Sequence, residues 1–315
     1  MLFAVAAVAA LATASVAAAA NGGFTPVSPN SPNASHTDTA YYVVLGFTSA
    51  IFVLVESLLV TFAVKYRRGK RARTVEGSQV HGHTRLELIW TVIPVVILCV
   101  IGVVVFLELP HISSAPATSD PLQVTVEGHQ FYWQFDYPNG ARTINDLYVP
   151  VDHVVDLKVV SADVIHSWWI PALGGKIQAI PGRTNHTWFE AEHTGTFAGQ
   201  CAELCGLFHA SMTADVIVTD EAGYRAAVSK APANLGSSEF HGVCATCHGM
   251  QGQGGYGPDI STNTLLTQPS ALAVILRNGF VRMPAVGNTW TDAQIKALTA
   301  YVKTHVYKGA SSNGG

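Results

Sequence analysis

The stretch Cys201-Ala-Glu-Leu-Cys205-Gly-Leu-Phe-His209-Ala-Ser-Met212 contains two thiols, an imidazole and a thioether. A second imidazole is available upstream at His166. Soft sulfur ligands combined with imidazole suit copper. A single blue copper needs only one cysteine, so two cysteines with two histidines favour two coppers bridged by both sulfurs. Such a pair shares one electron over both metals, and its geometry then changes little on reduction.

The same residues leave two other interpretations open. In an exported domain, Cys201 and Cys205 could form a disulfide. Two cysteines and two histidines could also bind structural zinc. Met212 is a poor zinc ligand, and its presence together with the ordering of all five groups favours copper over both alternatives.

A second cysteine pair, Cys244-Ala-Thr-Cys247-His248, has the C-x-x-C-H spacing of c-type haem attachment. The cysteines would form thioethers with the haem vinyl groups, and His248 would lie under the iron. A redox or zinc C-x-x-C pair is the alternative. The sixth ligand must approach from the opposite face, and Met250 is too close in sequence, which leaves Met283. Ligation by His and Met raises the reduction potential, as suits an electron donor.

Two apolar runs indicate a membrane protein. Apolar residues make up 49% and charged residues 12% of the 315 residues, too apolar for an ordinary soluble protein. The net charge of −3 argues against nucleic-acid binding. Runs 41–64 and 86–107 have spanning length and predict a hairpin over residues 41–108. Six basic residues between the runs mark the cytoplasmic side: Lys65, Arg67, Arg68, Lys70, Arg71 and Arg73.

Residues 1–20 are small, apolar and rich in alanine, which favours a removed signal peptide. Export of the N-terminus ahead of the hairpin needs such a signal. The segment has no Lys or Arg at its start, however, and a retained third span is the alternative.

The rest of the chain predicts two further domains. Residues 121–220 alternate apolar and polar positions between turn signals, which predicts an all-β sandwich or barrel. An Ala/Pro/Ser-rich linker is expected over about 228–238. Residues 236–310 are expected to be helical, with a capping box at Thr291 and Gln294.

Several motifs outside the cysteine stretch also carry a family resemblance. They include His166-Ser-Trp, Pro171-Ala-Leu-Gly-Gly-Lys176, Ile180-Pro-Gly-Arg183 and, in the second span, Arg85-Leu-Glu87-Leu-Ile-Trp90-Thr-Val-Ile-Pro94. Over roughly residues 41–220 the chain resembles cytochrome c oxidase subunit II, which implies a cupredoxin-like barrel. The resemblance implies these ligands for the two coppers of its CuA centre: His166, Cys201, Cys205, His209, Met212 and the backbone carbonyl of Glu203. It also implies that the Glu203 side chain faces subunit I and helps to hold magnesium.

The haem segment has a resemblance of its own. Gly255-Tyr-Gly257-Pro258-Asp resembles the loop of class I cytochromes c, in which the proline carbonyl accepts the histidine ring proton. The expected fold is therefore a multidomain membrane protein with a two-helix transmembrane hairpin, an all-β cupredoxin-like barrel and an all-α cytochrome c domain.

The stretch Gly128-His-Gln-Phe131-Tyr132-Trp133-Gln-Phe135 resembles the aromatic segment beside CuA in this family. An exposed Trp commonly stands there at the position of Phe131 and receives electrons from a soluble cytochrome. Phe131, Tyr132 and Trp133 are therefore candidates for electron transfer, while simple packing of the barrel is the alternative for Tyr132, Trp133 and Phe135. The substitution by Phe suggests a donor that docks differently, as a tethered one would.

By the same resemblance, Glu87 lies at the mouth of a proton-uptake channel of subunit I. The alternative is an ordinary interfacial residue. Glu56 is deeper in the first span and is expected to face a partner subunit.

The resemblance implies a subunit of a haem–copper terminal oxidase. Electrons would pass from haem c to CuA and then to subunit I, where oxygen is reduced with proton translocation, so this chain holds no catalytic residue. Expected partners are subunit I, subunit III and an upstream donor such as a cytochrome bc complex or small cytochrome. The location would be the bacterial plasma membrane, with both metal domains on the outer face. A CuA-bearing subunit of a nitric oxide reductase and a membrane-anchored electron carrier are the alternatives.

Charge supports docking between the two domains. Residues 121–220 hold eleven acidic and four basic side chains, a net charge of −7, whereas residues 236–315 hold three acidic and five basic ones, a net charge of +2. Opposite signs favour encounter, and a short connection raises the effective concentration.

Overall fold

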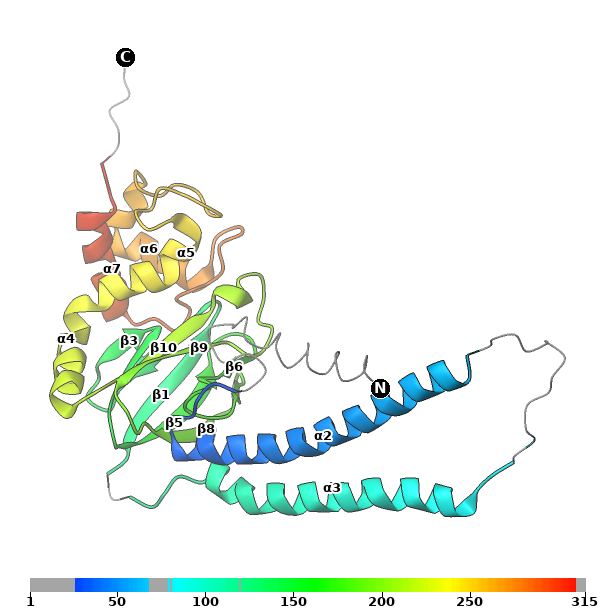
Figure 1. Cartoon of the computed structure of the whole chain (residues 1–315). Helices are drawn as coiled ribbons and strands as arrows, with labels where there is room; N and C mark the ends of the chain where they lie inside the picture. Colours follow the sequence, from blue (N-terminus) through cyan, green and yellow to red (C-terminus); the bar gives the residue numbers. More distant parts are fainter. Residues whose placement is uncertain (1–25, 68–78, 80, 119, 310–315) are drawn as a thin grey trace. The chain divides into compact units, whose positions relative to one another are not determined.

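The computed structural model describes residues 26–67, 79, 81–118 and 120–309 (Figure 1). They fall into two units: a helical one within 35–112, and a larger one formed by 29–34 together with the residues from 113 onward. The expectations for residues 1–20 and for the basic residues at 68–73 lie outside the described residues.

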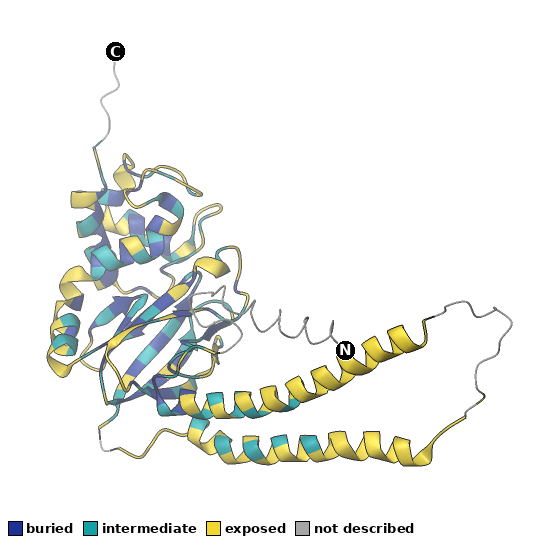
Figure 2. Cartoon of the chain, in the orientation of Figure 1, coloured by how far each residue is buried: buried dark blue, intermediate teal, exposed yellow. Residues whose placement is uncertain are grey.

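The helical unit contains α2 (Pro32–Lys65) and α3 (Thr84–Ser113), both long and apolar enough to cross a membrane. Their apolar side chains are exposed along almost their whole length (Figure 2). A helix that is apolar on every side is stable where lipid or another protein surrounds it. Each helix extends beyond the predicted apolar run because polar turns continue it. One such turn brings His36 Nδ1 within 2.6 Å of the Glu108 carboxylate.

Ten strands form the β-rich part of the larger unit. They are β1 (Leu122–His129), β2 (Tyr132–Asp136), β3 (Arg142–Ile144), β4 (Asp146–Pro150), β5 (Val154–Ser161), β6 (His166–Trp168), β7 (Ile177–Ala179), β8 (Asn185–Glu190), β9 (Gly195–Gln200) and β10 (Thr213–Thr219). The sheets have the strand orders β3-β2-β1-β5-β8, β4-β10-β9 and β6-β7.

The apolar residues of β1 point into the core of this β domain. Val126 is opposite Phe135 of the antiparallel strand β2 and opposite Val159 of the parallel strand β5, and all three are fully buried. The alternation seen in the sequence is therefore the alternation of the two sheet faces, and the expected cupredoxin-like β fold is confirmed.

Helices and short turns form the C-terminal part. They are α4 (Glu221–Glu239), a π-helical turn (Phe240–Cys244), α5 (Ala245–His248), a 3-10 turn (Thr264–Thr267), α6 (Pro269–Asn278) and α7 (Asp292–His305). The capping box predicted at the start of α7 is present, since the Thr291 and Gln294 side chains each bond the other's backbone. The helical cytochrome domain is confirmed as a fold.

The predicted linker at 228–238 is wrong, because these residues lie within α4. Val228 and Ala231 are buried in the β-domain core, and Gly236 packs directly on α7. A Cβ atom at Gly236 would lie 2.2 Å from the Ala297 carbonyl oxygen. Alanine, which contributed to the Ala/Pro/Ser-rich composition, is a good helix former, and Gly236 allows close contact between the helices. The two domains are thus joined by a packed helix.

Candidate metal centres

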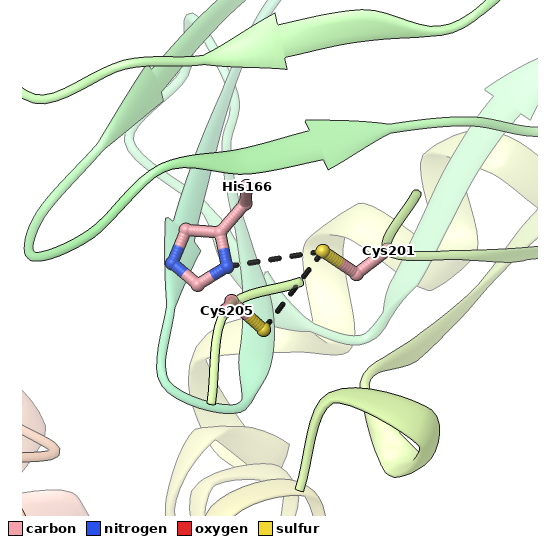
Figure 3. A group of neighbouring side chains, drawn as sticks. All are labelled: His166, Cys201 and Cys205. Carbon is pink, nitrogen blue, oxygen red and sulfur yellow. Dashed lines mark hydrogen bonds between the residues drawn. The ribbon is translucent and has the colours of Figure 1, made fainter. Parts of the chain in front are cut away.

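The first cluster consists of His166, Cys201 and Cys205, whose side chains lie close together (Figure 3). His166 begins β6, and Cys201 directly follows β9. His166 Nδ1 lies 3.9 Å from Cys201 Sγ, and the two sulfurs of Cys201 and Cys205 are 4.0 Å apart. All three side chains are buried. The sulfur separation is about twice the 2.05 Å of a disulfide bond, so the thiols are free.

The remaining predicted ligands lie around the same two sulfurs. His209 Nδ1 is 3.5 Å and Met212 Sδ is 3.8 Å from Cys205 Sγ. The Glu203 carbonyl oxygen is 3.2 Å from Cys201 Sγ. The structure therefore brings together all six groups of the predicted set. Six groups exceed the four that structural zinc takes, and the mixture of thiolate, thioether and imidazole suits copper.

Two glycines give these side chains room. A Cβ atom at Gly128 would lie 2.9 Å from the His166 ring, and one at Gly206 would lie 2.9 Å from Gln130 Nε2. Gly206 also has a φ of +137°, which side chains disfavour. The amide of Gln130 donates to the Cys205 carbonyl at 2.6 Å and so ties the cysteine loop to the β1–β2 turn.

Asp163 orients the first imidazole, and sequence reasoning gave it no role. Its carboxylate accepts from His166 Nε2 at 2.8 Å and from the backbone amides of Gln130 and Val164 at 2.7 and 2.6 Å. Burial by itself raises the pKa of Asp163, but these hydrogen bonds lower it below its ordinary value. The bond leaves Nδ1 of His166 to face the sulfurs. Asp163 stands three residues before His166 in the sequence, and this spacing is the signal that could have predicted their contact.

The two thiols differ in acidity. Burial by itself raises the pKa of Cys201, but hydrogen bonds from His166 and from the backbone lower it to about 7. Burial and the neighbouring Cys201 sulfur raise the pKa of Cys205 to about 12. Without a metal, Cys201 is therefore the thiol that loses its proton more readily. Binding of a metal would also displace the proton of Cys205.

The second site is a cavity of about 420 Å³. Its walls include Cys244, Cys247, His248, Pro258 and Met283. Met283 lines the cavity from the segment that follows α6, whereas the two cysteines come earlier in the chain, before α6. Met250 is 61% exposed and does not line the cavity. The three attachment residues and the predicted sixth ligand are therefore assembled around one space.

The His248 ring is held as the sequence predicted. Its Nδ1 atom lies 2.8 Å from the Pro258 carbonyl oxygen, which accepts the ring proton and leaves Nε2 free to bind a metal. A Cβ atom at Gly257 would lie 2.8 Å from the His248 ring, so only glycine fits there. The cavity, the free nitrogen and the Met283 thioether in the same lining fit a covalently attached haem c.

Family models match three successive parts of the chain. Residues 20–107 match the transmembrane domain of cytochrome c oxidase subunit II, and residues 141–220 match its periplasmic domain. Residues 231–302 match the model described as cytochrome c oxidase, cbb3-type, subunit III.

Curated relatives give the same result. Cytochrome c oxidase subunit 2 of Alkalihalophilus pseudofirmus is 40% identical over 65% of this chain and 66% of the relative. Subunit 2 of Cereibacter sphaeroides is 33% identical over 60% of this chain and 73% of the relative. The chain belongs to the cytochrome c oxidase subunit II family. A solved structure, the periplasmic domain of subunit II (CoxB) of Bradyrhizobium japonicum, is 37% identical, with a TM-score of 0.36 over 38% of this chain and 97% of that one.

The resemblance to subunit II also singled out the aromatic segment, Glu203 and Glu87, and the structure places each of them. Tyr132 and Trp133 are fully buried, and Phe131 is half-buried. The Trp133 ring lies edge-on to His166 with centroids 5.9 Å apart. The Glu203 side chain lies 3.5 Å from the Gln178 amide. Glu87 is exposed in the first turn of α3, where it accepts from the His83 backbone amide at 3.0 Å.

Proposed function

We propose that this chain is the electron-entry subunit of a haem–copper oxidase. Electrons would arrive singly from an external donor at the haem c held by His248 and Met283. Haem bound there would supply a one-electron carrier, and copper bound at the cysteine cluster would supply a second one. The copper pair would then pass each electron to subunit I, where oxygen is reduced to water with proton translocation.

The observation that carries this proposal is the assembly of two complete donor sets in one compact unit. We assign two copper ions to the first set, and the thiolates of Cys201 and Cys205 would hold them. His166, His209, Met212 and the Glu203 carbonyl would complete the set of ligands. Bound copper supplies a one-electron store, while the protein holds the ligands rigidly and Asp163 fixes one imidazole.

At the haem site, Cys244 and Cys247 would attach the group covalently. His248, oriented by Pro258, and Met283 would hold the iron. Met283 as the second ligand raises the reduction potential, which suits delivery of electrons to copper. We keep 121–220 as the copper domain and 236–310 as the cytochrome c domain, with α4 packed against both.

Further assignments follow the family. We propose subunit I, subunit III and a donor such as a cytochrome bc complex or small cytochrome as partners. The bacterial plasma membrane is the proposed location, with both metal domains outside. Glu203 would share magnesium with subunit I, and Glu87 would lie at a proton entry. The exposed position of Glu87 at the start of α3 is compatible with contact with the aqueous phase.

The test is metal analysis and EPR of the full-length chain purified in mild detergent. We expect two coppers and one covalent haem per chain, with one unpaired electron shared by both copper nuclei. A spectrum of one isolated copper, or zinc in place of copper, would overturn the two-copper site. Copurification with a second large subunit that bears its own haem supports the oxidase assignment. Isolation as a lone subunit would support an electron carrier instead.

A further inference from the structure

Residues of the β domain line the haem cavity. Gln130 and Phe131 line the cavity from the β1–β2 turn. Leu207 and Phe208 line it from residues 201–212, which carry most of the proposed copper ligands and are called the copper loop below. Leu207 and Phe208 lie between the proposed copper ligands Cys205 and His209. One short segment thus contributes to both metal centres.

Three aromatic rings connect the copper loop with the haem loop. Phe208 packs edge-on against Phe131, with centroids 5.5 Å apart, and against Tyr256, with centroids 4.9 Å apart. Tyr256 belongs to the loop that carries Pro258, the residue that orients His248. Edge-to-face pairs at these distances are attractive beyond the area they bury. Phe208 is therefore a direct contact between the loop of one centre and the loop of the other.

Hydrogen bonds hold the two domains together around this contact. The Tyr132 hydroxyl donates to the Val286 carbonyl at 2.7 Å. The Gln294 amide donates to Gln134 at 3.1 Å, and Asn288 donates to the Ala162 carbonyl at 3.0 Å. These bonds cross from the cytochrome side to the β side, so the loops meet in a fixed arrangement.

We infer that Phe208 is a positioning residue that closes the haem site from the copper side and holds the Tyr256 loop against the copper loop. This inference rests on the proposed function, because it assumes that haem occupies the cavity and copper the cluster. An apolar ring at the cavity wall keeps water from the iron, which disfavours the more highly charged ferric state and raises the potential. The Phe208 ring also packs between the copper loop and the haem loop, where it contacts Phe131 and Tyr256.

The experiment uses the full-length chain loaded with haem and copper. The variants are Phe208→Ala, Tyr256→Ala and the double variant, and the control is Leu204→Ala. Leu204 lies on the same loop but is 80% exposed and does not line the cavity. Three quantities are measured: the haem midpoint potential, the copper EPR spectrum and the rate of haem-to-copper transfer after rapid photoreduction of the haem.

We expect Phe208→Ala and Tyr256→Ala each to lower the haem potential and to slow transfer several-fold. The double variant should do little more than the stronger single variant, because both remove the same contact. Tyr256 is exposed and is not one of the proposed copper ligands, so Tyr256→Ala should fold and leave the copper spectrum unchanged. Leu204→Ala should change neither potential nor rate.

Unchanged potential and rate in both single variants would overturn the inference, and so would fully additive effects. Failure of the proposed function has a different signature. In that case the wild-type chain itself would show no haem-to-copper transfer, while the potential shift would still report whether Phe208 closes the cavity.

Discussion

The indole Nε1 of Trp290 donates a 2.8 Å hydrogen bond to the hydroxyl of Tyr132. Tyr132 begins β2 of the copper domain, whereas Trp290 precedes α7 of the cytochrome domain, and both are almost fully buried. The same hydroxyl donates to the Val286 carbonyl. A ring in the family's aromatic segment thus serves to join the two domains.

Replacing Tyr132 with Phe should destabilise the chain. The change leaves the buried Trp290 donor and the Val286 carbonyl without their partner, which costs about 1–3 kcal/mol. Denaturant titration followed by tryptophan fluorescence measures this. Tyr148→Phe is the control, because within the described residues Tyr148 bonds the Tyr137 hydroxyl through its backbone amide and carbonyl and not through its own hydroxyl. Equal stability of both variants would show that the bond does not hold the domains together.

Glu239 should make stability depend on pH. The residue is fully buried, and neither carboxylate oxygen has a well-formed hydrogen bond within the described ranges, although Gln294 and Arg142 face it. Burial raises the pKa of Glu239 from 4.5 to about 8. The native state therefore keeps a proton that the unfolded chain releases. The stabilising effect of this bound proton is complete below pH 4.5 and is lost as the pH rises through 8.

Glu239→Gln mimics the protonated acid and should remove this dependence. Near pH 8.5 the variant should be more stable than the wild type by up to about 5 kcal/mol, since each pKa unit corresponds to about 1.36 kcal/mol. Thermal unfolding across pH 5–9 tests this, with Glu221→Gln at the exposed start of the same helix as the control. Parallel pH profiles for wild type and Glu239→Gln would contradict the expectation.

Asp163→Asn should weaken copper binding. The amide cannot supply the negative charge that holds the His166 ring, and loss of such a contact typically costs about 10–100-fold in metal affinity. Competition with a copper chelator measures the affinity. Asp152→Asn is a matched control, because Asp152 lies in a turn with a φ of +55° that asparagine adopts readily. An affinity that matches the control would exclude a role for Asp163 at the metal.

Met283→Ala should leave the haem attached, because the proposed thioether bonds to Cys244 and Cys247 would remain. Loss of the thioether should lower the haem potential. Spectroelectrochemical titration gives the potential, and Met250→Ala is the control because Met250 does not line the cavity. If the potential falls in the Met250 variant and not in the Met283 variant, the axial assignment is wrong.

The sequence was most informative where neighbours in the chain are also neighbours in space. The copper loop holds four of its side-chain ligands within twelve residues, and the haem motif places Cys244, Cys247 and His248 within five. The His248–Pro258 bond and the capping box of α7 are equally local, and both are confirmed. The composition of residues 228–238 misled because alanine and serine occur in linkers and in close-packed helices alike.

The amino-acid sequence by itself determined the two apolar helices, the alternation of the strands and the two clusters of candidate ligands, since each depends on local spacing or residue chemistry. Only the tertiary structure decided that Asp163 orients His166, that Phe208 lines the haem cavity and that Tyr132 joins the domains. These contacts link residues brought together by strand pairing and domain packing. Local spacing cannot specify them, because they depend on how the sheets and helices pack against one another.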